Sequence, residues 1–180
     1  MVKGRWRVRR HRVVYQGRLV RLDVDELEYC GRRFTRENLI HPGAVAVVPV
    51  LPDGRLLFIR QFRYAAQREL LELPAGTLER GESAQACARR ELEEETGFTA
   101  RSLRRLGVCY PVPGYSTERI GLFVARGLRP TQQRLEPDEV IRVVRYSPTQ
   151  VRQLIARRQI LDAKSLVGLL YYFWNRLQYS

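Results

Sequence analysis

The sequence is short of several residues on which common sites depend. Only two of its 180 residues are histidine, so neither a histidine-based triad nor a histidine-rich metal site is expected. The three cysteines stand alone without a CxxC pair, which supports neither a disulfide framework nor a zinc site. This cysteine usage fits the reducing cytoplasm.

Long apolar segments are also absent. The longest apolar runs, 44–51 and 166–174, fall well short of the roughly 18–20 residues that a membrane-spanning helix needs. The basic N-terminus is not followed by the apolar region of a secretory signal. We therefore expect no membrane span, and 180 residues suffice for one domain with at most a small appendage.

Lysine is scarce as well, because two lysines leave 30 arginines among the 32 basic residues. The net charge of +13 favours non-specific attraction to polyanions but does not indicate a nucleic-acid site. The arginines are spread along the chain and cluster only in the first dozen residues. A phosphate-bearing small molecule fits this composition, and no specific nucleic-acid partner is expected.

The expected elements are strands on both sides of one helix. We expect strands at 12–15, 19–29, 33–39, 44–51, 55–62, 69–73, 103–110, 119–125 and 140–146, and helices at 83–96, 149–157 and 163–177. Residues 44–51 are almost continuously apolar, as in a centrally buried strand, and Pro52-Asp53-Gly54 predicts a turn that makes a hairpin with the next strand. The order is typical of an α/β fold in which helices cover both faces of a mixed sheet.

The stretch 76–98, GTLERGESAQACARRELEEETGF, carries the strongest chemical signal. If 83–96 is a helix, then Glu91, Glu94 and Glu95 stand at i, i+3 and i+4, where like charges repel. They also lie near the helix C-terminus, whose dipole disfavours anions. A divalent cation would remove these conflicts, because clustered carboxylates suit Mg²⁺ or Mn²⁺. The alternative is a solvated acidic helix end with arginines paired at i+4.

The spacing within this stretch favours the metal site. Nine positions over 23 residues match the Nudix box of the Nudix hydrolase family: Gly76, Glu82, Arg90-Glu91-Leu92, Glu94-Glu95 and Gly97-Phe98. The chain therefore resembles a Nudix hydrolase. The resemblance implies a Nudix-type α/β/α sandwich and hydrolysis of a nucleoside diphosphate linked to another moiety.

The resemblance also implies roles for residues of this stretch. The implied metal ligands are Ala75, Glu82, Glu91, Glu94 and Glu95. Of these, Glu91 and Glu95 would bind two or more Mg²⁺ or Mn²⁺ ions directly, Glu82 would act through water, and Ala75 would use its carbonyl. Arg90 would hold the carboxylates in place by charge-assisted hydrogen bonds.

Features outside the box resemble the ADP-ribose pyrophosphatase subfamily. Pro113, sixteen residues after the box glycine Gly97, stands where that subfamily has a marker proline. The motifs RQFR at 60–63 and LELPAG at 71–76 resemble two others, and DEVI at 138–141 with LDAKSLV at 161–167 matches its C-terminal pattern. The resemblance covers about residues 28–172.

This subfamily resemblance implies a substrate site. Arg63 would contact the diphosphate, because a guanidinium offers a bidentate fork for phosphate. Glu118 would line the site beside the turn formed by Pro113 and Gly114. Glu139 and Glu94 are alternative general bases. Ordinary roles stay open for these residues, such as a plain turn at 113–114 or a surface arginine at 63.

The expected reaction is Mg²⁺-dependent hydrolysis of ADP-ribose to AMP and ribose 5-phosphate in the cytoplasm. Alternatives are another nucleotide sugar or nucleoside diphosphate derivative, an RNA 5′-end pyrophosphohydrolase, and a non-catalytic ligand sensor, which the complete set of box acids disfavours. We divide the chain into a strand appendage, 1–43, and a hydrolase domain, 44–180. The strand-rich appendage has little core of its own, so we expect it to join two chains in a homodimer.

Overall fold

The fold is described from a computed structural model that places residues 5–137 and 139–177, with side chains as far as residue 174. The chain forms two compact units, and each is described by itself. The smaller unit comprises residues 1–43 and 110–119, and the larger unit comprises residues 44–109 and 120–180. No helix in the described part of the chain is both long and apolar enough to cross a membrane.

A three-stranded antiparallel sheet forms most of the smaller unit. Its strands, in spatial order, are β1 (Arg7–Gln16), β2 (Arg21–Tyr29) and β3 (Arg32–Ile40). The segment 110–119 runs beside β3. There the Leu39 amide donates to the Tyr115 carbonyl at 2.7 Å, and the Thr117 amide donates to the Leu39 carbonyl at 3.0 Å. The smaller unit is therefore built from two parts of the chain, and 110–119 is the part that the sequence did not predict to belong to it.

The sheet of the smaller unit leaves many apolar side chains exposed. Every residue of β1 is exposed, and Trp6 just before it stacks on Tyr29 with ring centroids 4.7 Å apart. The β1 side chains that remain at least half exposed include Val8, Val13, Val14 and Tyr15. Exposed apolar side chains gathered on one strand are typical of a surface that packs against a protein.

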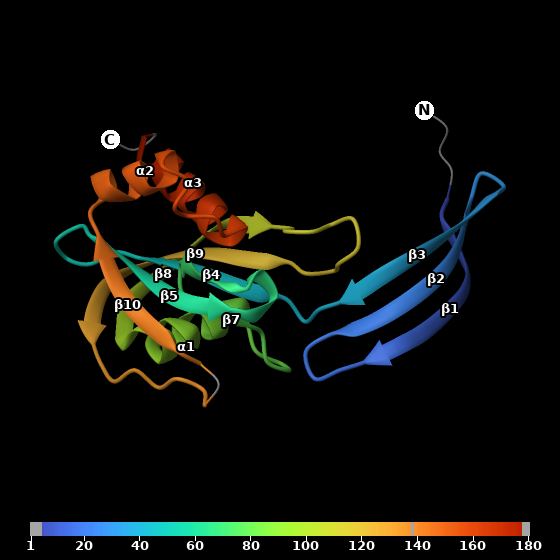
Figure 1. Ribbon diagram of the computed structural model, residues 1–180, viewed down its shortest axis with the longest axis horizontal. Coiled ribbons are helices and arrows are strands. Elements are labelled where there is room, and N and C mark those ends of the chain that lie inside the picture. Colours follow the sequence, from blue (N-terminus) through green and yellow to red (C-terminus); the bar gives the residue numbers. More distant parts are fainter. Residues whose placement is uncertain (1–4, 138, 178–180) are drawn as a thin grey trace. The chain divides into compact units, whose positions relative to one another are not determined.

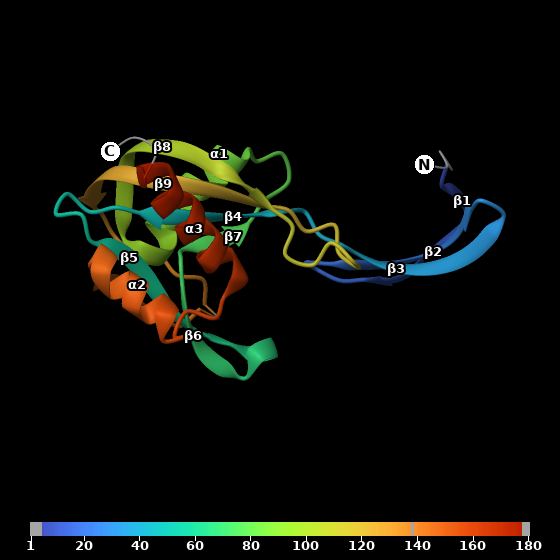
Figure 2. The ribbon, with the colours of Figure 1, turned by 90° about the horizontal axis from the view of Figure 1, so that it is seen from above.

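The larger unit consists of two sheets and, among the described residues, three α-helices (Figure 1). The four-stranded sheet has the order β7-β4-β9-β8 and the three-stranded sheet the order β10-β5-β6. The strands are β4 (Ala44–Pro49), β5 (Leu56–Arg63), β6 (Arg68–Glu72), β7 (Ala75–Thr77), β8 (Phe98–Cys109), β9 (Ile120–Pro130) and β10 (Ile141–Tyr146). The helices are α1 (Ala84–Thr96), α2 (Pro148–Ala156) and α3 (Ala163–Leu177), and a 3₁₀ turn, η1 (Tyr64–Ala66), closes the β5–β6 hairpin (Figure 2).

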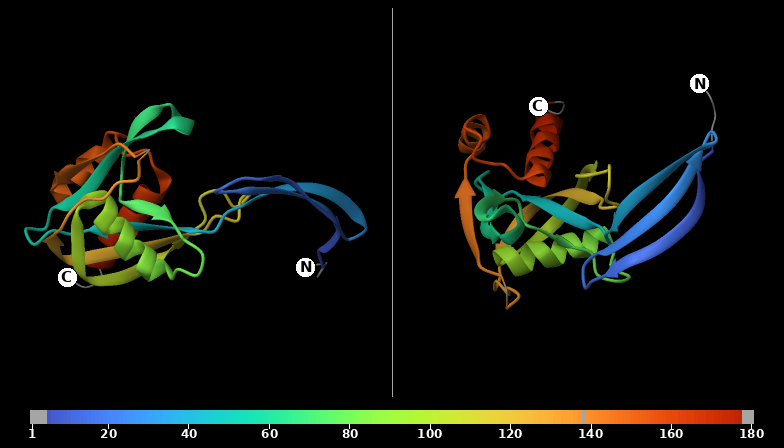
Figure 3. Two further views of the ribbon diagram at one scale, coloured as in Figure 1. Left: turned by 90° about the horizontal axis from the view of Figure 1, so that it is seen from below. Right: turned by 45° about the vertical axis from the view of Figure 1, so that its right-hand side comes forward.

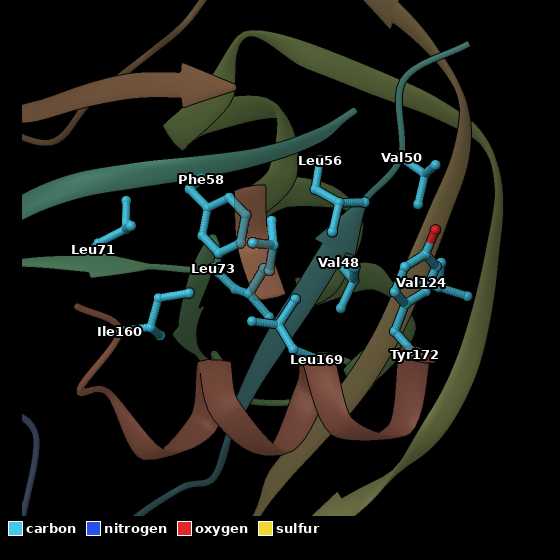
Figure 4. Close-up of a cluster of buried hydrophobic side chains, with 11 residues drawn as sticks. Val48, Val50, Leu56, Phe58, Leu71, Leu73, Val124, Ile160, Leu169 and Tyr172 are labelled. Atoms are coloured by element: carbon cyan, nitrogen blue, oxygen red, sulfur yellow. The ribbon is translucent and has the colours of Figure 1, made fainter. Parts of the chain in front are cut away.

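The four-stranded sheet is mixed and covered on both faces. β4 and β9 are parallel, whereas the β4–β7 and β8–β9 pairs are antiparallel. On β4, Val45 and Val47 pack in a core with α1, while Val48 packs in a core with α2 and α3. Figure 3 shows α1 across one face of the sheet, and Figure 4 shows Leu169 and Tyr172 of α3 on the other. The α/β/α fold class is therefore confirmed.

The predicted hairpin between 44–51 and 55–62 is wrong. β4 uses its two edges for β7 and β9, while β5 pairs with β10 and β6 in the other sheet. Next to the turn, the two segments share one bridge, Val50 to Leu56, and the Leu51 amide donates to the Arg55 carbonyl at 2.8 Å. A strand has only two edges, and because β7 and β9 occupy both edges of β4, no edge is left for β5. β8 and β9 are also longer than predicted, because their pairing with each other continues to Phe98 and Pro130.

Candidate active site

Helix α1 begins and ends at residues suited to those positions. Ser83, the N-cap, accepts a hydrogen bond from the Ala86 amide at 3.2 Å. Gly97 ends the helix at φ 68°, a conformation that glycine adopts without strain. The last two turns carry the acids of the predicted metal site. Glu91 and Glu95 are 8% and 2% exposed, so both carboxylates are largely withdrawn from water.

Arg90 bonds to three acids of this cluster. Its Nε and Nη2 donate to the two carboxylate oxygens of Glu82 at 3.0 Å and 2.9 Å. Its Nη1 donates to Glu91 at 2.8 Å and to Glu94 at 3.1 Å. The bonds to Glu82 are the largest cause that raises the pKa of Arg90 above its ordinary value. The guanidinium thus fixes the spacing of the three carboxylates.

The carboxylate of Glu91 lies directly against the backbone of Gly76. A Cβ at Gly76 would stand 1.9 Å from Cδ and Oε1 of Glu91 and 2.4 Å from Oε2. No side chain tolerates such an approach, so only glycine leaves room for this carboxylate. The glycine therefore sets how close the acid cluster comes to β7.

Glu95 is held by the same strand. Its Oε2 accepts a hydrogen bond from the Ala75 amide at 2.8 Å. The sequence resemblance pointed to the Ala75 carbonyl, whereas the contact in the structure is made by the amide. A metal-binding role for the carbonyl stays a prediction.

Burial raises the pKa of both withdrawn acids. Loss of solvent raises the pKa of Glu91 to about 7, against the opposing effect of Arg90, and the charges of Glu94 and Glu139 add to the increase. Burial also raises the pKa of Glu95 well above its ordinary value, although the Ala75 amide lowers it. Burial thus disfavours the charged form of both acids, and a divalent cation beside them would favour it.

The donor set fits a divalent metal ion. Its ligands would be carboxylate oxygens, which Mg²⁺ and Mn²⁺ prefer, and the absent side chain at Gly76 gives Glu91 its place in the set. Within the described ranges, no three His, Cys, Asp or Glu side chains already converge on one point. Arg90 is the positive group paired with Glu82, Glu91 and Glu94.

Arg63, at the end of β5, is held by Glu72 at the end of β6. Its Nε and Nη2 donate to the two oxygens of Glu72, each at 2.8 Å, and Glu72 is fully buried. Lys164 of α3 forms a second ion pair with the same carboxylate. After Glu72, the charge of Glu95 also helps to raise the pKa of Arg63, so the guanidinium lies within electrostatic reach of the acid cluster.

Glu72 and Lys164 were not predicted as site residues. They stand 92 positions apart. The sequence contained the motifs LELPAG and LDAKSLV around them, but nothing in either motif says that the two side chains meet.

Glu139 lies half-buried in the loop before β10. Its carboxylate accepts a hydrogen bond from the Glu136 amide at 3.0 Å. Its charge raises the pKa of both Glu91 and Glu95, which places it near the acid cluster. The two predicted alternatives for the general base, Glu94 and Glu139, therefore belong to one region of the larger unit.

The beginning of the same loop is fastened to the end of α1. The Thr131 amide donates to the Gly97 carbonyl at 2.8 Å, and the Arg134 amide donates to the Glu94 carbonyl at 3.0 Å. The Gln133 side chain donates to the Glu95 carbonyl at 2.6 Å. These bonds satisfy carbonyls that a helix end otherwise leaves without partners.

The remaining predicted residues, Pro113, Gly114 and Glu118, belong to the smaller unit. Pro113 and Gly114 lie in a turn closed by the Ser116 amide, which donates to the Val112 carbonyl at 3.0 Å. The Glu118 amide donates to Ser116 Oγ at 3.1 Å. Their contact with substrate stays a prediction.

Several known proteins are similar to this chain in sequence or in fold. The NUDIX domain profile matches residues 40–166. An ADP-ribose pyrophosphatase of Bacillus subtilis (strain 168) is 35% identical over 161 residues, which cover 88% of this chain and 87% of that protein. A GDP-mannose pyrophosphatase of Yersinia enterocolitica is 36% identical over 138 residues, 72% of either chain. The crystal structure of an ADP compounds hydrolase matches with a TM-score of 0.85 and 26% identity, covering 97% of this chain and 96% of that one.

Proposed function

Because this chain belongs to the NUDIX domain family, whose hydrolases act on phosphoric anhydrides, we propose that it hydrolyses ADP-ribose to AMP and ribose 5-phosphate with Mg²⁺. The observation that carries the proposal is the acid cluster on α1, in which Glu91 and Glu95 are buried and Glu94 is partly exposed. Arg63 lies within electrostatic reach of this cluster. The similarity to an ADP-ribose pyrophosphatase over most of both chains supports this substrate.

Each residue of the cluster has a task in this reaction. Glu91 and Glu95, assisted by Glu94, would hold two or more Mg²⁺ ions, or Mn²⁺ in their place. When bound, the metal supplies neutralisation of the pyrophosphate charge and a lowered pKa of the attacking water. Arg90 keeps the carboxylates at their spacing, and Glu82 holds Arg90 through two hydrogen bonds.

Arg63 would bind the diphosphate. Its guanidinium is fixed on one side by Glu72, through Nε and Nη2, whereas Nη1 takes no part in that pair. A held guanidinium loses little freedom when it binds phosphate, so it can place the reacting phosphorus accurately. From the sequence resemblance we propose that Pro113, Gly114 and Glu118 also contact the substrate.

Water attacks a phosphorus of the pyrophosphate, and a carboxylate must accept its proton. Glu139 and Glu94 are the two candidates. Replacing each with glutamine separates their roles, because loss of a base lowers kcat at saturating Mg²⁺, whereas loss of a metal ligand is partly overcome by more Mg²⁺. A drop in kcat of about 10²-fold or more at saturating metal identifies the base.

The substrate assignment is tested by a panel of ADP-ribose, ADP-glucose, GDP-mannose, a dinucleoside polyphosphate and a nucleoside triphosphate. ADP-ribose should give the highest kcat/KM by at least about tenfold, or about 1.4 kcal/mol of transition-state stabilisation. If GDP-mannose leads, the activity named for the Yersinia relative becomes the better assignment. If the nucleoside triphosphate gives the highest kcat/KM, only the assignment to the hydrolase family remains.

We further propose that residues 1–43 are an appendage to a hydrolase domain at 44–180 and join two chains in a homodimer. The exposed apolar side chains of β1 support this proposal. Light scattering at micromolar concentration should give twice the mass of the 21.1 kDa chain, and a monomer would refute it. None of the three cysteines, Cys30, Cys87 and Cys109, forms a disulfide, which fits the cytoplasm as the proposed place of action.

A further inference from the structure

Lys164 is an unusual choice of residue in this chain. It is one of two lysines against 30 arginines, and the other, Lys3, lies outside the described residues. Its side chain is 14% exposed, and its ammonium pairs with Glu72 and, at 3.0 Å, with Asp162. A compact ammonium with three rotatable donors can serve both of these carboxylates at once.

Glu72 is the carboxylate that Lys164 shares with Arg63. Its side chain is 1% exposed, and a carboxylate this deep needs positive partners. Both oxygens accept from Arg63, and Oε2 accepts from Lys164 as well. The charges of Arg63, Lys164, Glu72 and Asp162 sum to zero. Without Lys164, the remaining three charges would sum to a net negative charge around Arg63, the arginine proposed to bind the diphosphate.

Further hydrogen bonds hold the part of this network at the start of α3. Both the amide and the hydroxyl of Ser165 donate to Asp162, at 2.9 Å and 2.5 Å. The Leu73 amide donates to Ser165 Oγ at 2.7 Å, which ties the start of α3 to the residue after Glu72. Lys164 is therefore fixed on one side by the helix start and on the other by the end of β6.

We propose that Lys164 is a positioning residue for the pyrophosphate-binding arginine. By holding Glu72 to α3 it fixes the guanidinium of Arg63 and preserves its positive charge toward a pyrophosphate group. This inference rests on the proposed function, in which Arg63 contacts the diphosphate. Lys164 itself touches neither substrate nor metal in this proposal and acts through Glu72.

The kinetic test compares Lys164→Met with Leu166→Ala. Lys164→Met should raise KM for ADP-ribose about tenfold and leave kcat within about threefold, since the lost charge-assisted bond, about 1.4 kcal/mol, affects binding in ground and transition state alike. Leu166 packs against the core on the same helix but is outside the ion network, so Leu166→Ala should lower Tm without changing KM. Equal KM values in wild type and Lys164→Met overturn the inference.

A second measurement needs neither turnover nor a folded variant. With ¹⁵N-lysine the enzyme has only two side-chain ammonium signals, and the one that exchanges slowly with water should be Lys164, because carboxylates hold its protons. Adding inorganic pyrophosphate should shift this signal, and inorganic sulfate at equal ionic strength should not. A signal that ignores pyrophosphate overturns the inference.

The two measurements also separate this inference from the proposed function. If the signal shifts with pyrophosphate but ADP-ribose is not hydrolysed, the proposed substrate is wrong and the positioning role stands. If ADP-ribose is hydrolysed, but Lys164→Met leaves KM unchanged and pyrophosphate leaves the ammonium signal unchanged, the function stands and Lys164 only stabilises the fold.

Discussion

Replacing Gly76 with alanine is the sharpest test of how the acid cluster is built. The new Cβ would start 1.9 Å from the Glu91 carboxylate and needs about 3.4 Å for an ordinary contact. The carboxylate must therefore retreat by roughly 1.5 Å, which exceeds the misplacement of about 1 Å that can cost about 10²-fold in rate. We expect kcat/KM to fall by at least that factor, or about 2.7 kcal/mol.

The fold should survive the change, because the clash is with the end of a flexible side chain. Thermal unfolding should show a Tm within a few degrees of wild type, and Mg²⁺ titration of activity should show weaker metal binding. Gly54→Ala is the matched control with the opposite pattern. Gly54 has φ 82° and open space around its Cβ, so alanine there should lower stability by about 1–2 kcal/mol and leave activity unchanged.

A double variant shows whether the effect passes through Glu91. If Gly76→Ala acts by displacing that carboxylate, adding it to Glu91→Ala should cause no further loss. Additive losses would place the damage in the β7 backbone. Wild-type kcat/KM in Gly76→Ala would refute the reasoning altogether, since the carboxylate position would then be irrelevant to turnover.

Three further predictions concern charge. Arg90→Lys should lower kcat/KM about 10–100-fold with little change in Tm, because one ammonium cannot replace a guanidinium bonded to three carboxylates. Burial alone would raise the pKa of Glu72, but Arg63 and Lys164 hold it below its ordinary value. The stabilisation from the charged carboxylate is therefore present above the ordinary pKa of a glutamate and is lost as pH falls through the lowered pKa. Urea unfolding should therefore show Glu72→Gln destabilised at pH 7, with the difference from wild type narrowing below pH 4.5; a constant difference would contradict this. Chelation should abolish activity, and Mg²⁺ at a hundred times its Kd should restore it and stabilise the fold by about 2.7 kcal/mol in thermal unfolding.

The parts of the fold that local sequence dictates were predicted well. Helix 83–96 was predicted from composition and spacing, and the structure has it at Ala84–Thr96 with Ser83 as its cap. The buried strand at 44–51 was predicted from its apolar run, and β4 is buried throughout. Both depend on interactions between residues close in sequence or on simple burial.

The choice of partners could not be read in this way. The turn at 52–54 suggested a hairpin, but the edges of β4 are taken by strands some 30 and 75 residues further on. The same limit hid the pairing of Glu72 with Lys164, across 92 residues. Gly76 was counted as one position of the box, while its physical purpose, room for the Glu91 carboxylate, depends on coordinates.

The fastening of the loop before β10 limits how Glu139, one of the two proposed general bases, can move. Arg134 is bonded to the end of α1, and Ile141 is already paired with Gln61 in the sheet. Glu139 stands two residues before Ile141, so its Cα stays within about 7 Å of that fixed point. So short a tether allows a swing on the nanosecond-to-microsecond scale, faster than typical turnover of about 1–10³ s⁻¹. Movement of this loop should then not limit the rate. A higher solvent viscosity that slows the loop should therefore leave kcat unchanged.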